Sequence, residues 1–187
     1  MDEKKRLVGR DSKAKNGAYI RELTFGVEDG LVSTLGFVVG MTTAAVSSRI
    51  IIIGGIAEVV AAGISMAAGT YLSIKSQAEF FSTIKKKIRG GYDIHLENPP
   101  KAASIMFFSF IVMALIPLLP YFFLSAERAI TLSVIGTIAA LFIFGSVKSL
   151  ITKRSWIRSG VEMTAVGLIA ALAGYLVGLV AKTYFGI

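Results

Sequence analysis

The sequence predicts an all-α membrane protein with five transmembrane helices, its N-terminus in the cytosol and its C-terminus outside. Charged residues make up 17% of the 187 residues, against about 25% in soluble domains, and the mean hydropathy is +0.69. A helix needs about 20 apolar residues to cross a membrane, whereas barrel strands are about half as long. Five apolar stretches of 21 to 25 residues meet the helical requirement: 23–46, 50–74, 102–124, 129–151 and 161–181.

The positions of Lys and Arg predict the orientation. Seventeen of these 20 residues fall in 1–22, 75–101 and 148–158, which five spans place on one side of the membrane. Short loops rich in Lys and Arg stay in the cytosol. We therefore interpret the net charge of +8 as orientation signals and contacts with anionic lipid. No nucleic-acid partner is expected, because no basic patch is interleaved with aromatic residues.

The first two spans are joined by a turn at 47–49, so we expect antiparallel neighbours. The first span is not uniformly apolar, because Glu28 and Asp29 interrupt it. It also carries Gly36 and Gly40, four residues apart, a spacing that lets helices approach closely. The glycines indicate either packing within the chain or a contact between subunits.

The chain divides into a basic cytosolic segment, 1–22, and a transmembrane domain, 23–187, whose longest loop is 75–101. We expect 75–89 to continue the second helix into the cytosol. Gly90-Gly91 would end that helix, and Asn98-Pro99-Pro100 would begin the next.

The last three spans carry prolines, a short connecting turn and small residues. The third carries Pro117 and Pro120, which we expect to bend it and to shape a cavity. The turn at 125–128 pairs the third span with the fourth, and the fifth span carries a run of small residues from Gly167 to Gly178.

Ionisable residues inside a membrane are costly and are functional candidates by default. Glu28, Asp29 and Glu58 are such residues, and Met66 lies near them as a soft thioether. At 1.5 Å per residue, Asp29 lies ~9 Å and Met66 ~12 Å from the cytosolic ends of antiparallel helices. Glu58 lies ~12 Å farther out than Met66. The arithmetic predicts a ladder of a carboxylate and a thioether, followed by a second carboxylate.

Carboxylates suit divalent cations, and a thioether favours transition metals over Mg²⁺ or Ca²⁺. Asp29, Glu58 and Met66 are therefore the candidate metal ligands. Two other interpretations stay open: a buried acid paired with a base, and a methionine that fills space.

Other acidic residues are accessory candidates. Glu162 follows Arg158 by four residues, a spacing typical of an interfacial ion pair. In the loop, Asp93, His95 and Glu97 alternate, which indicates either a weak metal-collecting site or a solvated segment.

Several function classes are excluded or disfavoured. The chain has no cysteine and one histidine, which excludes thiolate sites and HExxH metalloproteases. We expect no enzyme and no bound cofactor. A membrane scaffold without transport activity remains the alternative, although it would leave three intramembrane acids unexplained.

Four motifs together resemble the vacuolar iron transporter family. They are Asp-Gly-Leu-Val-Ser at 29–33, Gly-Ile-Ser-Met-Ala-Ala-Gly-Thr-Tyr-Leu-Ser at 63–73, Pro-Leu-Leu-Pro-Tyr at 117–121 and Arg-Ser-Gly-Val-Glu-Met at 158–163. The resemblance covers residues 20–181 and implies a five-helix homodimer whose pathway lies between the two copies of the first helix. It also implies export of Fe²⁺, often with Mn²⁺, from the cytosol in exchange for protons. The family's pathway residues fall on Asp29, Glu58 and Met66.

The chain departs from the family pattern in two places. Typical plant members carry a long Glu-rich domain between the second and third spans, where this chain has a short Lys-rich loop. Glu79 stands near where that domain would begin. Glu28 occupies a position that is commonly Asn. The resemblance implies a plasma membrane location in a prokaryote and a vacuolar-type membrane in a eukaryote.

Overall fold

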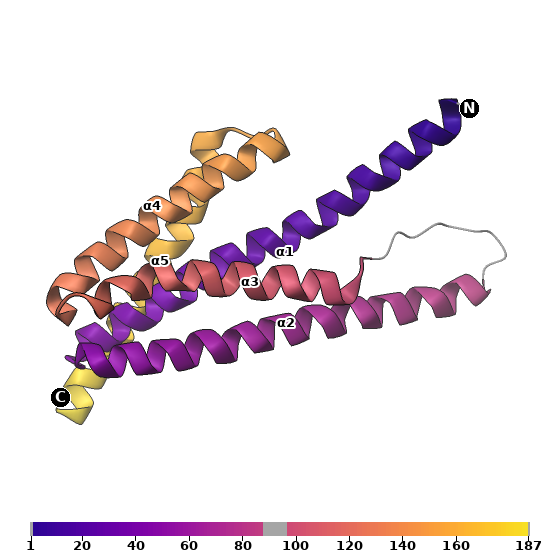
Figure 1. Ribbon diagram of the computed structural model, residues 1–187. Helices are drawn as coiled ribbons and strands as arrows, with labels where there is room; N and C mark the ends of the chain where they lie inside the picture. Colours follow the sequence, from indigo (N-terminus) through magenta and orange to yellow (C-terminus); the bar gives the residue numbers. More distant parts are fainter. Residues whose placement is uncertain (1, 88–96, 187) are drawn as a thin grey trace.

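The computed structural model describes residues 2–87 and 97–186, with side chains for 19–83 and 97–186. Its elements follow one another as a bundle of long helices (Figure 1): α1 (Asp2–Thr43), α2 (Ser48–Lys87), α3 (Pro99–Leu118), the 3-10 helix η1 (Leu119–Phe122), α4 (Ala126–Thr152) and α5 (Trp156–Phe185). Within the described residues, five helices are long and apolar enough to cross a membrane. The predicted five-span, all-α membrane protein is confirmed.

The first two helices extend well beyond the predicted spans. α1 begins at Asp2, although the part that can cross a membrane is Tyr19–Thr43. α2 runs to Lys87, so the helical continuation of the second span is confirmed to that residue. The proposed stop at Gly90-Gly91 lies outside the described residues. Lys, Arg and Glu favour helices as strongly as most apolar residues do, so apolar length alone underestimates the helices.

The start of α3 follows the predicted signal. Asn98 caps the helix, and its side chain accepts a hydrogen bond of 3.2 Å from the Lys101 backbone N–H. Pro99 and Pro100 occupy the first helical positions, where a missing N–H costs nothing.

The two ends of the bundle differ in composition. The N-terminus, the end of α2, the start of α3 and the α4–α5 turn share one end (Figure 1). We call this the basic end, because the described side chains there include Arg21, Lys75, Lys101, Lys148, Lys153, Arg154 and Arg158. The α1–α2 turn, η1 and the C-terminus lie at the opposite end, the far end (Figure 1).

α1 is the central helix and contacts all four of the others, α3 and α5 most extensively. α2 packs chiefly on α3, and α4 packs chiefly on α5. The neighbours predicted from short turns, α1 with α2 and α3 with α4, do touch, but these contacts are smaller than those between helices distant in sequence. Turn length therefore identifies neighbours without ranking their contacts.

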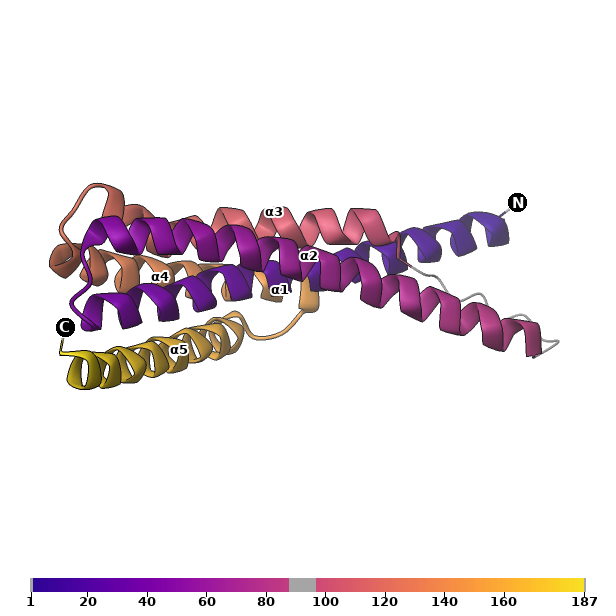
Figure 2. The ribbon, with the colours of Figure 1, turned by 90° about the horizontal axis from the view of Figure 1, so that it is seen from below.

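The glycines of α1 pack within the chain. A Cβ added at Gly36 would lie 3.3 Å from the Ala170 carbonyl oxygen, and one at Gly40 would lie 3.0 Å from that of Gly174. The expectation that Gly36 and Gly40 approach a second copy of α1 is therefore wrong, because α5 of the same chain occupies that face. Figure 2 shows α5 beside α1 at the far end.

Pro117 and Pro120 lie where the third span ends, at the far end of the bundle. Pro117 lies inside α3, and Pro120 lies in η1, where the α-helix gives way to a 3-10 turn. Ser133 of α4 donates a hydrogen bond of 2.5 Å to the Pro117 carbonyl oxygen. A neighbouring hydroxyl thus satisfies a backbone group near the break, as membrane helices require.

Candidate metal-binding site

A cavity of about 940 Å³ opens at the basic end. α1 forms its floor, α2 forms one wall, and the α4–α5 turn forms the other. In Figure 1, α4 and α5 diverge from α2 toward this end. The charged residues that line the cavity are Arg21, Glu22, Glu28, Lys148, Arg154 and Glu162. No residue of α3 lines it, so the expectation that Pro117 and Pro120 shape a cavity is wrong for this one.

Toward the far end, α5 crosses α1 and leaves little space between them. A Cβ at Gly174 would clash with the Gly36 carbonyl oxygen, and a Cβ at Gly178 would clash with that of Gly40. Backbone-to-backbone contact of this kind leaves no room for a hydrated ion. The cavity thus lies at the basic end, and α1 and α5 leave no comparable space between them toward the far end.

Two of the predicted ligands lie just beyond the cavity floor. Asp29 is half-buried and follows Glu28, which lines the cavity. Glu58 of α2 is half-buried and accepts a hydrogen bond of 3.4 Å from the Thr34 hydroxyl of α1. Asp29 precedes Thr34 by five residues on α1. The fold thus places Asp29 and Glu58 on neighbouring helices, within about two helical turns of one another along the bundle.

The Thr34–Glu58 hydrogen bond also fixes the levels of the helices. Counting from that contact along antiparallel helices, Asp29 is level with Gly63. Met66 then lies about one turn nearer the basic end, and Glu58 lies about 7–8 Å farther out than Asp29. Glu58 remains the outermost of the three residues, but Met66, and not Asp29, lies nearest the basic end, so the predicted order of these two is reversed.

Met66 has two environments. One side of it packs against the buried cluster of Val59, Phe110 and Ala114, and it also lines the cavity. Both interpretations of this residue, as a space-filling side chain and as a soft ligand, agree with that position.

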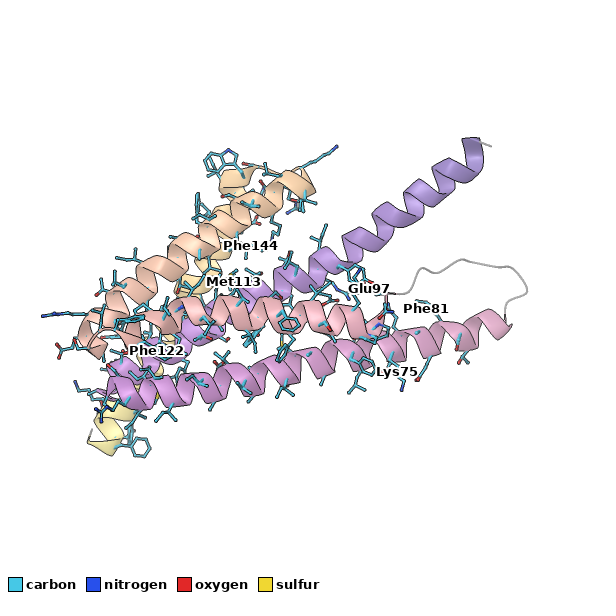
Figure 3. The ribbon with its side chains drawn as sticks, viewed as in Figure 1. Lys75, Phe81, Glu97, Met113, Phe122 and Phe144 are labelled. Atoms are coloured by element: carbon cyan, nitrogen blue, oxygen red, sulfur yellow. The ribbon has the colours of Figure 1, made fainter. Side chains whose placement is uncertain are left out.

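Of the accessory candidates, some line the cavity and others do not. Glu28 and Glu162 line the cavity, and the predicted ion pair is present, with Arg158 Nε 3.2 Å from Glu162 Oε1. Glu79 is exposed on α2 away from the cavity. Asp93 and His95 lie outside the described residues. Glu97, which ends that loop motif, lies beside α1 at the start of α3 (Figure 3).

The structure adds one residue that sequence reasoning missed. Glu22 lines the cavity and is 4% exposed. Glu22 precedes the first apolar stretch, so composition assigns it to the basic segment. The helical spacing could have identified it, because Glu22 and Asp29 are seven residues apart and therefore lie on one face of α1.

Among the described side chains, no three His, Cys, Asp or Glu residues are close enough together to hold one metal ion. A single chain therefore supplies a pair of carboxylates rather than a full set of strong ligands. Backbone oxygens, water, Met66 or a second copy of the chain would have to complete the coordination.

Comparisons with known proteins bear on these residues. A sequence model of the VIT family matches residues 20–93 and 82–179, which together include both candidate carboxylates and most of each of the five spans. The chain belongs to the VIT family.

Named VIT relatives are similar over most of their length. Vacuolar iron transporter 1 of Eucalyptus grandis is 28% identical, over 93% of this chain and 92% of its own. Vacuolar iron transporter 1 of Arabidopsis thaliana is 29% identical, over 89% and 87%. Vacuolar iron transporter homolog 3 of the same plant is 28% identical, over 87% and 82%.

The lengths of these alignments also locate a difference within the VIT family. The Eucalyptus alignment spans 228 positions although this chain has 187 residues, so that relative carries residues absent here. The alignment with homolog 3 spans only 166 positions for a similar share of the chain. The two matched pieces of the family model overlap at residues 82–93, which include the end of α2.

Proposed function

We propose that the protein exports a divalent transition metal, Fe²⁺ and also Mn²⁺, from the cytosol in exchange for protons. One observation carries the proposal: a cavity open at the basic end reaches the residues beside the Asp29–Glu58 pair. The names of the relatives, vacuolar iron transporters, support the choice of substrate. The excess of Lys and Arg at the basic end supports a cytosolic location for that end.

The mechanism follows from the carboxylates. The metal enters the cavity, reaches Asp29 and Met66, and passes outward to Glu58. Metal ligands must be deprotonated to bind, so the same carboxylates hold either a cation or protons. Release toward the far end cannot pass between α1 and α5 as they stand, because their glycine backbones are in contact there.

We further propose a homodimer formed through α1. The other four helices leave one face of α1 open in the cavity, where Phe25 is 52% exposed. A second copy of α1 on this face would cover Phe25 and bring a second Asp29 toward the first. Two copies would supply the ligands that one chain lacks.

The test is metal flux into proteoliposomes that contain a metal-sensitive dye and a pH dye. Fe²⁺, Mn²⁺, Zn²⁺ and Ca²⁺ are compared for the wild type, Asp29→Ala and the exposed control Glu79→Gln, each checked for folding and dimerisation by size-exclusion chromatography with light scattering. We expect Fe²⁺ and Mn²⁺ flux with opposing proton flux, lost only in Asp29→Ala. A folded dimer without flux of any metal would contradict transport and favour a scaffold.

A further inference from the structure

Among the residues whose exposure the structure gives, Glu22 is the only buried carboxylate, at 4% exposed. It stands in the cavity wall, about 10 Å from Asp29 along α1. A buried charge is costly unless it is paired and hydrogen-bonded. Its partner is the preceding residue: Arg21 donates to Glu22 Oε1 from Nε, at 3.0 Å, and from its terminal nitrogen.

The two members of this pair are placed very differently. The Glu22 side chain is 5% exposed, whereas the Arg21 side chain is 63% exposed and lies at the cavity mouth. The same guanidinium lies 3.5 Å from Glu97, whose side chain is 16% exposed and which stands immediately before α3 (Figure 3). Arg21 could therefore stay paired with Glu97 if its contact with Glu22 were broken.

We propose that Glu22 is a first docking point for the divalent cation, and that Arg21 is the counter-ion that the metal displaces. This inference rests on the proposed transport function and deepens it. The guanidinium moves wholly to Glu97, so neither carboxylate is left without a cation. Arg21 acts through Glu22 and is a positioning residue, while Glu22 touches the metal.

The exchange discriminates by charge. A divalent ion brings twice the charge of the guanidinium it replaces, and its attraction to the carboxylate is correspondingly stronger at equal distance. A monovalent ion brings no more charge than Arg21 and none of its directed hydrogen bonds. Arg21 therefore disfavours Na⁺ and K⁺ at Glu22 more than it disfavours the divalent metal.

The test measures Mn²⁺ transport by the full-length protein in proteoliposomes, with KM and kcat separated. We expect Glu22→Gln to raise KM at least roughly fivefold, the lower range of coupling between interacting sites, with kcat little changed. Arg21→Gln should lower KM by a similar factor and admit competition by K⁺, while Arg21→Lys restores the wild-type values. The double variant should behave as Glu22→Gln alone, because Arg21 acts only through Glu22.

A purely structural ion pair predicts something else. Arg21→Gln would then behave like Glu22→Gln, with lower kcat or poorer folding in both, and the charged Arg21→Lys would not restore selectivity against K⁺. An unchanged KM in Glu22→Gln, or independent effects in the double variant, would also overturn the proposal.

A binding measurement separates this inference from the proposed function. Free Mn²⁺ is followed by its paramagnetic resonance in detergent solution, on an Asp29→Asn background that disables the deeper site. We expect Mn²⁺ binding to persist and to vanish when Glu22→Gln is added. Binding of Mn²⁺ to Asp29→Asn that requires Glu22 would support the docking point even if the protein does not transport metal. Equal Mn²⁺ binding with and without Glu22→Gln would contradict the docking point even if transport is confirmed.

Discussion

The two halves of the bundle are built from different contacts. At the basic end, α1 is flanked by a cavity that holds six charged side chains. At the far end, the same helix meets α5 through closely packed glycine backbones. One half has a space lined by charged groups, and the other has helices in backbone contact. For the transporter proposed above, this difference corresponds to a state open toward the basic end.

The largest effect should come from adding bulk at the far end. In Gly174→Ala the new methyl group would collide with the Gly36 backbone, which cannot move aside as a side chain can. Overpacking of this kind costs about 1–3 kcal/mol, and we expect a loss of that size in the free energy of unfolding in mixed micelles.

The matched control is Gly136→Ala in α4. Nothing lies within 4 Å of a Cβ at that position, so the usual gain from replacing a helical glycine, about 0.5–1 kcal/mol, should appear instead. Equal stability changes in the two variants would contradict the tight α1–α5 contact.

The next effect concerns the carboxylate pair. Glu58→Gln keeps an acceptor for the Thr34 hydroxyl but removes the charge. Loss of even an outer-shell partner costs 10–100-fold in metal affinity, so we expect at least a ~10-fold loss of Mn²⁺ flux. Glu79→Gln, on the exposed surface, should retain full flux. Matching losses in both variants would show that Glu58 has no special role.

Met66→Leu separates the two interpretations of that residue. The two side chains have similar volumes, so packing against Val59 and Phe110 should change by less than about 1.5 kcal/mol. If the thioether binds metal, the ratio of Fe²⁺ to Ca²⁺ flux should fall severalfold while stability is kept. An unchanged ratio would assign Met66 to packing alone.

The smallest effect lies at the end of α3. Ser133→Ala removes the hydrogen bond to the Pro117 carbonyl oxygen. Hydrogen bonds between membrane helices average about 0.6 kcal/mol, so we expect a loss of that order in unfolding free energy and little change in transport. A large loss of transport would instead show that the break at Pro117 moves during the cycle.

The sequence predicts the five-span fold class well, because apolar length is a local signal. The cap at Asn98 and the continuation of α2 were readable for the same reason. Helix pairing was less predictable, since the glycines of α1 show that something packs closely but not which helix does so. α5, more than a hundred residues away along the chain, took the place assigned to a second subunit.

The residues of the candidate site also divide into those with a local sequence signal and those that depend on tertiary packing. Asp29 and Glu58 are conspicuous because each interrupts an apolar run, and antiparallel geometry brings them near one another. Glu22 escaped notice because it lies among polar residues, where a buried charge leaves no trace in composition. Its burial depends on the helices packed around α1, and that arrangement comes from tertiary packing.

The most direct test of the open and closed halves uses the absence of cysteine from the chain. Ser65→Cys lies in the cavity lining, and Ala171→Cys lies in α5, packed against the far-end core. Each variant is reacted in sealed proteoliposomes with a maleimide that cannot cross the membrane, with and without Mn²⁺. The account predicts fast labelling of Ser65→Cys from the basic end alone, slowed by Mn²⁺, and little labelling of Ala171→Cys from either side. Labelling of Ala171→Cys as fast as Ser65→Cys, or no effect of Mn²⁺ on the cavity residue, would contradict it.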